Sequence, residues 1–355
     1  MAEIVHDNEI WRDLIDLERL MRWMNEQGLG SGAIEDAQPL GGGTQNILLR
    51  FVRDGRPYVL RRPPRAPRPE SDEVMRREMR VLAALAGSEV PHPGFIAGEA
   101  DPDVLGTAFY LMEPIEGFNA TQRMPPLHAG DPSVRQRMGE ALADAAVALS
   151  RLDPGALGLA TLGKLDGWVE RQVPRWLGQL ESYARFDGWP GLSALPGVET
   201  ITGWLKANRP ATMRRGLIHG DYHIANVMFC NDSPAVAAVI DWELSTLGDP
   251  LIDLGWLTAT WPDPGEERTH IPIEPSSGLP SLEQLVTRYL EATGRSAEDA
   301  RWYSVLAPFK LGAIQEGSHA RACAGLAPRA MGDALHAHTV DLFHRALRRI
   351  DNPIL

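Results

Sequence analysis

The chain has 355 residues, of which 44% are hydrophobic and 23% charged, a composition that suffices for a folded protein with a sizeable core. Its formal net charge of -12 at pH 7 argues against a nucleic-acid-binding surface, because binding to phosphate backbones relies on clustered lysine and arginine. The sequence has only two cysteines, no apolar run near the roughly 18 residues of a membrane span, and no secretory signal in its first residues. We therefore expect a cytoplasmic protein with no nucleic-acid and no membrane partner.

The first third of the chain predicts a helix followed by a small β-rich lobe. Residues 9–28 carry an apolar stripe at helical spacing, which Gly28 ends. Short alternating runs then predict two strands joined by a turn and, after a helix at residues 70–86, two more strands. The strands are expected at residues 46–52, 57–61, 94–99 and 107–112.

After residue 113 the pattern becomes mostly helical. Pro114 and Gly117 interrupt the chain between the two differently patterned parts, so we predict domains at residues 1–113 and 114–355. Helical spacing is found at residues 132–152, 167–185, 196–207, 281–293, 297–318 and 328–349. The expected fold class is α+β, with a small β-rich lobe that contains one inserted helix and a larger, mostly helical lobe.

The most informative segment is Leu217 to Asn226, with the sequence LIHGDYHIAN. Its apolar start predicts the end of a buried strand, and the His-Gly-Asp turn that follows puts Asp221 and Asn226 in one short loop. Apolar residues 227–229 and 235–240 then predict a β-hairpin, which returns Asp241 toward that loop.

Two carboxylates and a carboxamide in this order match the needs of nucleotide-dependent phosphoryl transfer. That reaction requires a carboxylate to orient a hydroxyl and accept its proton, and hard oxygen ligands for Mg²⁺. The spacing Asp-x4-Asn, followed by Asp241 at the end of the next strand, agrees with the catalytic and metal-binding parts of a kinase.

A glycine-rich turn precedes the first strand and could bring backbone N–H groups close to a phosphate. It consists of Gly41, Gly42, Gly43, Thr44, Gln45 and Asn46. Arg61 ends the second strand and Glu78 follows on the helix, so we predict an ion pair between them that faces the nucleotide. Arg62 is expected to point to the opposite face of the strand, toward solvent. The basic segment 61–68, RRPPRAPR, predicts an extended loop that is either solvated or in contact with an anionic substrate.

With these residues assembled, the chain resembles the aminoglycoside phosphotransferase and choline kinase superfamily, which has a bilobal protein-kinase-like fold. The resemblance rests on the glycine-rich turn at 41–46, the loop at 217–226, Ile240-Asp241-Trp242-Glu243, and the segment 247–254. It extends over nearly the whole chain. The strand at 58–64 is most similar to the branch of kinase-like domains linked to acyl-CoA dehydrogenases, in which an arginine at this strand position is expected.

The resemblance implies ATP and Mg²⁺ as cofactors and a role for each matching residue. Asp221 would be the catalytic base, and Asn226 and Asp241 the Mg²⁺ ligands. Residues 1–113 would form the nucleotide-binding lobe, in which backbone groups of Glu113 and Ile115 bond adenine. Supporting roles are expected for His219 as a brace of the loop, for Glu243 near the metal or the acceptor, and for His223, which either assists the transferring phosphate or bonds backbone. Asp249 and Asp253 are expected to cap the helix that follows them.

The acceptor is expected to be a hydroxylated small molecule such as a hydroxy acid or a hydroxyacyl thioester, with Arg321, Arg329 or the 61–68 segment as anionic anchors. An aminoglycoside O-phosphotransferase is the first alternative; its acidic pocket would draw on Glu243, Asp263, Glu266, Glu267 and Glu316. A catalytically silent nucleotide-binding regulatory module is the second, motivated by an arginine in place of the strand lysine. A hydrolase is weaker, because no serine or cysteine nucleophile lies nearby. The histidines and cysteines show no paired spacing, so no zinc site is predicted. The oligomeric state, and the choice of ATP over GTP, stay open.

Overall fold

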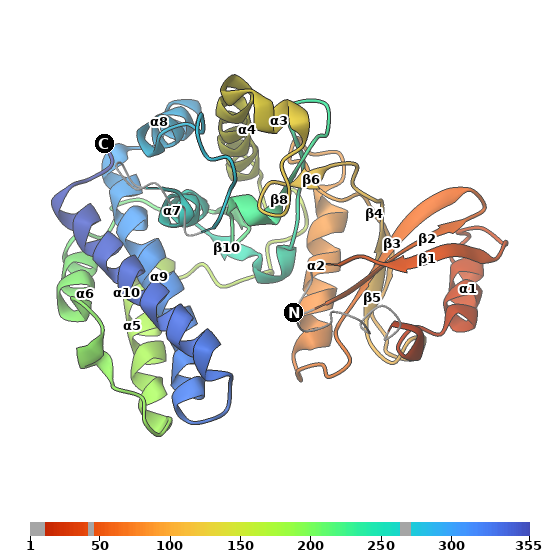
Figure 1. The fold of residues 1–355 in the computed structure, drawn as a ribbon, viewed down its shortest axis with the longest axis horizontal. Helices are drawn as coiled ribbons and strands as arrows, with labels where there is room; N and C mark the ends of the chain where they lie inside the picture. The colour runs from red at the N-terminus through yellow and green to blue at the C-terminus, as the bar shows by residue number, and fades with distance from the viewer. Residues whose placement is uncertain (1–10, 42–45, 263–270) are drawn as a thin grey trace. The chain divides into compact units, whose positions relative to one another are not determined.

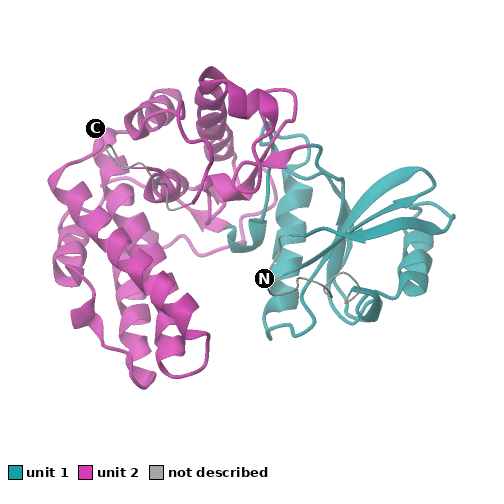
Figure 2. Ribbon diagram, in the orientation of Figure 1, with its two compact units in different colours: residues 1–116, 237–245 teal, residues 117–236, 246–355 magenta. Residues whose placement is uncertain are grey.

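The computed structural model describes residues 11–41, 46–262 and 271–355. The chain forms two compact units, shown in different colours in Figure 2. Unit 1 contains residues 1–116 and 237–245, and unit 2 contains residues 117–236 and 246–355. This division differs from the predicted one at residue 113 because the short segment 237–245 returns to unit 1.

Unit 1 is built on a five-stranded antiparallel sheet with the order β1-β2-β3-β5-β4 (Figure 1). The strands are β1 (Ile34–Pro39), β2 (Ile47–Arg53), β3 (Arg56–Arg62), β4 (Phe95–Glu99) and β5 (Phe109–Met112). Four of them agree with the prediction, whereas β1 was missed because its residues show little apolar alternation.

The helices α1 (Leu17–Glu26) and α2 (Ser71–Leu85) lie on opposite faces of this sheet (Figure 1). Helix α1 begins later than predicted, because Asp16 caps it by accepting hydrogen bonds from the N–H groups of Glu18 and Arg19. Its Leu20, Trp23 and Met24 are buried in one apolar cluster with side chains from β2, β3 and β5.

Alternation along β3 decides which side chains face each helix. Tyr58 and Leu60 belong to the apolar cluster on the α1 face, so Arg61 points to the α2 face. Arg62 therefore points back to the α1 face, where it donates to the carbonyls of Leu14 and Leu105. Our prediction that Arg62 meets solvent was wrong, because the segment before α1 covers that face and leaves the residue only 6% exposed.

Unit 2 is mostly helical. Its helices are α3 (Pro126–Gly130), α4 (Pro132–Ser150), α5 (Trp168–Glu181), α6 (Val198–Ala207), α7 (Leu251–Thr260), α8 (Leu282–Thr293), α9 (Ala297–Cys323) and α10 (Arg329–Asp351). Helical periodicity did not predict α7, although a helix capped by Asp249 was expected. Every one of its residues is buried, and its sequence lacks the polar face that produces helical periodicity. No helix among the described residues is long and apolar enough to cross a membrane.

Short strands in unit 2 hold the loop at residues 219–226. β7 (Gly216–Ile218) enters the loop and pairs with β10 (Thr246–Gly248), and β8 (Val227–Phe229) leaves it and pairs with β6 (Phe118–Asn119). β9 (Val236–Val239) is the neighbour of β8 in a sheet with the order β6-β8-β9, so the predicted hairpin is present. The chain then continues into the segment 237–245 of unit 1.

Candidate functional site

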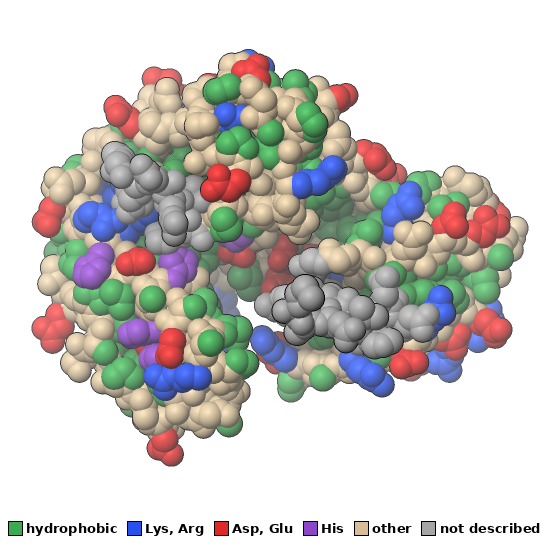
Figure 3. Space-filling model, viewed as in Figure 1, with side chains coloured by type: hydrophobic (Ala, Val, Ile, Leu, Met, Phe, Trp, Pro, Cys, Tyr) green, Lys and Arg blue, Asp and Glu red, His purple; other side chains and the backbone are tan. Residues whose placement is uncertain are grey.

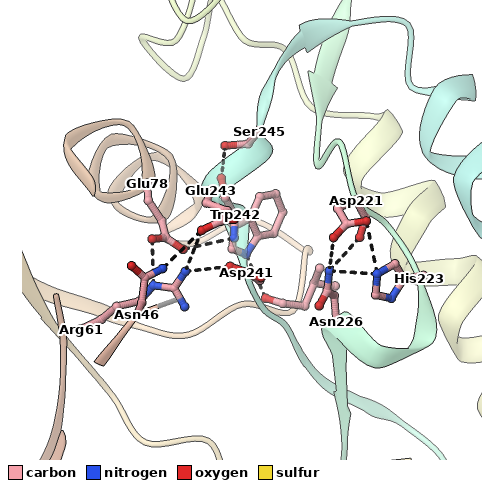
Figure 4. Close-up of polar contacts among 11 residues, drawn as sticks. Asn46, Arg61, Glu78, Asp221, His223, Asn226, Asp241, Trp242, Glu243 and Ser245 are labelled. Carbon is pink, nitrogen blue, oxygen red and sulfur yellow. Dashed lines mark hydrogen bonds and ion pairs between the residues drawn. The ribbon is translucent and has the colours of Figure 1, made fainter. Parts of the chain in front are cut away.

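In unit 1, five polar side chains that we call the Arg61 cluster gather on the α2 face of the sheet (Figure 4). They are Asn46, Arg61, Glu78, Asp241 and Glu243. Arg61 donates from Nε to Glu78 Oε2 at 3.0 Å and from Nη2 to Asp241 Oδ1 at 2.7 Å. The same Nη2 lies 3.8 Å from Glu243 Oε2, which accepts a hydrogen bond from Asn46 Nδ2 at 3.3 Å. The structure therefore contains the Arg61–Glu78 ion pair that the sequence predicted, and adds two further carboxylates to it.

Burial and the neighbouring charges shift the pKa values of Arg61 and Glu78 in opposite directions. The Glu78 side chain is 1% exposed, and burial raises its pKa to about 6, although Arg61 lowers it. Burial by itself lowers the pKa of Arg61, but Glu78, Tyr110 and Asp241 raise it well above its ordinary value. The guanidinium therefore stays charged at every physiological pH.

Asp241 is positioned by an unusual backbone conformation. Its φ of 66° lies in the left-handed region, which aspartate tolerates better than most residues with a side chain. The bend lets the next N–H, that of Trp242, donate to Glu78 Oε1 at 3.2 Å. Helix α2 thus fixes both Arg61 and the backbone beside Asp241 through one buried carboxylate.

In unit 2, the loop from His219 to Asn226, called the Asp221 loop, is held by a residue of α7. Asp253 Oδ2 and Oδ1 accept hydrogen bonds from the N–H groups of His219 and Gly220, at 2.8 and 2.9 Å. Gly220 has a φ of 88°, which explains why a glycine stands at this turn. We predicted a helix-capping role for Asp253, which was wrong. Asp249 does cap the N-terminus of α7, because its Oδ1 accepts a hydrogen bond from the N–H of Leu251.

Three side chains of unit 2 orient the Asp221 carboxylate. Oδ1 accepts from Trp256 Nε1 at 2.5 Å. Oδ1 also lies 3.2 Å from His223 Nε2, and Oδ2 accepts from Asn226 Nδ2 at 3.0 Å (Figure 4). Burial raises the pKa of Asp221, but His223, His219 and Trp256 outweigh it and hold that pKa at about 2. The carboxylate is therefore ionised and accepts hydrogen bonds only.

Two residues of unit 2 near Asp221, Trp256 and Lys310, were not among the predicted site residues. The Lys310 Nζ lies 4.5 Å from the ring centre of Trp256 and 5.3 Å from that of Trp176. Burial lowers the pKa of Lys310 to about 8, against the attraction of Asp253 and Asp221. A single lysine inside the apolar sequence of α9 was the signal that could have identified it.

The other predicted site residues are placed as follows. Gly42, Gly43 and Thr44 lie outside the described residues, and Gly41 immediately precedes them. The N–H of Glu113 donates to Gly94 O at 2.8 Å, so only its carbonyl remains for a ligand; Ile115 follows two residues later in the same unit.

The residues predicted to contact the acceptor lie outside the described residues, are buried, or bond to a neighbouring side chain. Asp263, Glu266 and Glu267 lie outside the described residues. Glu316 is fully buried, and Arg329 pairs with Asp333 at 2.9 Å. Arg321 Nη2 donates to Ser318 Oγ at 3.1 Å.

Comparisons with known proteins agree with this arrangement. Residues 36–303 match the model of the phosphotransferase enzyme family. Acyl-CoA dehydrogenase family member 11 of Pongo abelii is 30% identical over 86% of the chain, and the probable acyl-CoA dehydrogenase IBR3 of Arabidopsis thaliana is 32% identical over 74%. The chain spans 39% and 33% of the lengths of these two relatives.

Solved structures show the same fold. A putative aminoglycoside phosphotransferase from Ralstonia eutropha superposes with a TM-score of 0.77 at 27% identity, covering 95% of this chain and 98% of the other. The complex of APH(2″)-IIa with streptomycin and ATP has a TM-score of 0.54 at 16% identity, covering 93% and 98%, and supports the fold alone. The chain has the protein-kinase-like fold and belongs to the phosphotransferase enzyme family.

Proposed function

We propose that the chain is an ATP-dependent kinase that transfers a γ-phosphoryl group to a hydroxyl of a small metabolite, a hydroxy acid or a hydroxyacyl thioester. The observation that carries the proposal is the Asp221 carboxylate, which is ionised, oriented by Trp256, His223 and Asn226, and still 27% exposed. A carboxylate held in this way accepts a hydrogen bond from an incoming hydroxyl and fixes its direction.

The donor atoms of the chain fit Mg²⁺, which prefers hard oxygen ligands. Asp241 uses Oδ1 for Arg61, and its Oδ2 accepts no hydrogen bond from the described residues. Asn226 donates through Nδ2 to Asp221, so its Oδ1 carbonyl remains as a ligand atom. Asp241 and Asn226 would hold the ion, which when bound supplies positive charge to the nucleotide phosphates.

In the proposed reaction, the acceptor hydroxyl donates its hydrogen bond to Asp221. Its oxygen bonds to the γ-phosphorus while the bond from that phosphorus to the β–γ bridging oxygen breaks, and the proton passes to Asp221. A pKa near 2 means that this proton moves late, after the oxygen has begun to bond phosphorus. Lys310 would influence Asp221 indirectly, because its ammonium group lies against the Trp256 ring that orients the Asp221 carboxylate.

Unit 1 would bind the nucleotide. Arg61 donates from Nε and Nη2 within the cluster, and its Nη1 has no hydrogen bond to any described residue, so it is free to contact a phosphate. Glu78 keeps the guanidinium in this orientation. The carbonyl of Glu113 and the N–H of Ile115 would bond adenine, and Gly41 to Asn46 would cover the phosphates.

The choice of acceptor rests on the relatives and on the acidic residues. The curated relatives are named as acyl-CoA dehydrogenases, and a kinase domain joined to such an enzyme would act on acyl thioesters that carry a hydroxyl. An aminoglycoside would need accessible carboxylates. Of the described candidates, Glu243 lies against Arg61 and Asn46, and the fully buried Glu316 accepts from Trp189, which disfavours a polycationic acceptor.

The test measures ADP release from Mg-ATP with hydroxyacyl-coenzyme A thioesters, free hydroxy acids and aminoglycosides as separate acceptors. We expect turnover with an acceptor that carries the hydroxyacyl group. Asp221→Asn should lose turnover and keep its affinity for ATP. The control Asp232→Asn makes the same exchange of carboxylate for carboxamide at an exposed position in the turn before β9, and should leave turnover unchanged. Turnover with aminoglycosides alone would replace the proposed acceptor. Binding of ATP without turnover on any acceptor would show a silent nucleotide-binding module instead.

A further inference from the structure

Helices α9 and α10 lie side by side in unit 2 and bring together residues that are far from the Asp221 loop in sequence (Figure 1). Glu316, His319 and Cys323 recur at intervals of three and four on α9, so they share one face of that helix. Asp333 and His336 share a face of α10 in the same way. We call these five residues the Glu316 cluster.

Three members of the cluster, Glu316, His319 and His336, have potential ligand atoms close to one another. His336 Nδ1 lies 2.9 Å from Glu316 Oε2 and 3.2 Å from Oε1. The imidazole rings of His319 and His336 stack with their centres 4.2 Å apart. One ligand atom from each of the three residues lies within 4.8 Å of the others.

Two members of the cluster, Glu316 and His319, are buried, and the Glu316 carboxylate is held in place by a neighbouring donor. Glu316 is 0% exposed, and the indole of Trp189 donates to its Oε1 at 2.7 Å, leaving Oε2 turned toward His336. A hydrogen-bond donor behind a ligating carboxylate is a regular feature of metal sites. Gly332 allows the close approach of the two helices, since a Cβ there would lie 2.3 Å from the Ala322 Cβ and 3.3 Å from the His319 Cα.

One buried nitrogen in the cluster has no hydrogen bond. His319 is 4% exposed, and its Nδ1 is inaccessible and makes no hydrogen bond in the described structure. The nearest carboxylate oxygen, Asp333 Oδ1, is 3.5 Å away, which is close enough for electrostatic attraction but does not give a well-formed hydrogen bond. A buried polar atom without a partner is costly, and it points to a ligand.

We propose that Glu316, His319 and His336 bind one divalent transition-metal ion of the zinc class and thereby join α9 to α10. Two imidazoles and a carboxylate are a donor set typical of zinc and unsuited to Mg²⁺ or Ca²⁺, which take oxygen ligands. Bonds of about 2.0 Å in a tetrahedral site put ligand atoms about 3.3 Å apart. Small side-chain rotations reach this spacing from the present separation of at most 4.8 Å.

The proposed site differs from our expectation that the sequence contains no zinc site. That expectation considered only ligands paired at short spacing in the sequence, whereas the second histidine of the proposed site lies on another helix. Glu316 and His319 stand in the arrangement Glu-x-x-His, which places both side chains on one helix face and was the available signal.

Histidine side chains are visible on the surface of unit 2 (Figure 3). The His336 side chain is 24% exposed, so solution metal can reach the cluster from the side of α10. The test uses the metal-stripped full chain, titrated with ZnCl₂ by calorimetry in excess Mg²⁺, which occupies sites of hard oxygen ligands. We expect one zinc ion per chain. The variant His336→Gln should lose about 100-fold in zinc affinity, whereas His344→Gln, exposed on the same helix, should bind as the wild type does.

Equal zinc affinity in wild type and His336→Gln, or no zinc binding by the wild type, would overturn the proposal. A measurement that needs no variant is the zinc K-edge absorption of the loaded wild type. Two imidazoles at about 2.0 Å are expected, and a shell of oxygen ligands alone would refute the site. Neither measurement depends on phosphotransferase activity, so the result stands apart from the proposed function.

Discussion

Arg61→Met should destabilise unit 1 in a manner that depends on pH, because it leaves Glu78 buried without its cation. Glu78 is 1% exposed, and its pKa is about 6 in the intact pair, compared with an ordinary value of 4.5. Since Arg61 lowers that pKa, the variant raises it further. A carboxyl with a raised pKa in the folded state contributes stability below 4.5, which is lost as the pH rises through the folded pKa.

The size of this loss of stability follows from the ordinary pKa of 4.5 and the folded-state pKa of about 6. In the wild type the loss levels off above pH 6 at about 2 kcal/mol, since each pKa unit corresponds to about 1.4 kcal/mol. Buried glutamates without a cation can reach a pKa of about 8–9. With such a value we expect Glu78 of the variant to stay protonated in the folded state, so the loss of stability continues to about 5 kcal/mol at pH 8. The stability difference between wild type and variant that depends on Glu78 should therefore grow from below about 1 kcal/mol at pH 6 to about 3 kcal/mol at pH 8.

Hydrogen exchange of the α2 amides measures this difference, because Glu78 lies on α2 and the exchange reports the stability of the region around it. The double variant Arg61→Met/Glu78→Gln should lose the pH dependence, since the titrating group is gone. Arg56→Met is the matched control: its ion pair with Glu113 has side chains 51% and 60% exposed, and its loss should cost less than about 1 kcal/mol. A pH-independent destabilisation by Arg61→Met would refute the reasoning.

Three further outcomes are expected. Asp221 has a pKa of about 2, below its ordinary 3.8, so it contributes stability above pH 3.8 that is lost as the pH falls through 2. In urea titrations the difference in the free energy of unfolding between wild type and Asp221→Asn should therefore shrink by about 1 kcal/mol from pH 5 to pH 3. A constant difference would contradict the assigned pKa. Trp256→Phe removes the indole donor to Asp221 and should lower kcat about 10-fold with the KM for ATP unchanged, as steady-state kinetics would show. Gly255→Ala puts a Cβ 2.6 Å from the Tyr303 carbonyl oxygen where α7 packs on α9, and should lower the free energy of unfolding by about 1–3 kcal/mol; an unchanged denaturation midpoint would contradict that packing.

Local signals in the sequence sufficed for much of the fold. Strand β2, helix α2 and most helices of unit 2 follow from periodicity, because one face of each is more buried than the other. Strand β3 is buried on both faces from Tyr58 to Arg62, and the turn that joins it to β2 was the signal for it. The elements that periodicity missed lack that asymmetry. β1 has little apolar alternation, and α7 is buried on all sides.

For the candidate site, the sequence by itself determined the Asp221 loop, Asp241 and the Arg61–Glu78 pair, because they lie in motifs with fixed short spacing. Only the tertiary structure decided which distant groups support them. Trp256, Asp253 and Lys310 come from α7 and α9, and helix packing, which no local pattern encodes, brings them to the loop. The same holds for the Glu316 cluster, since a metal site shared by two helices requires the register of α9 against α10, and that register is set by side-chain packing between them.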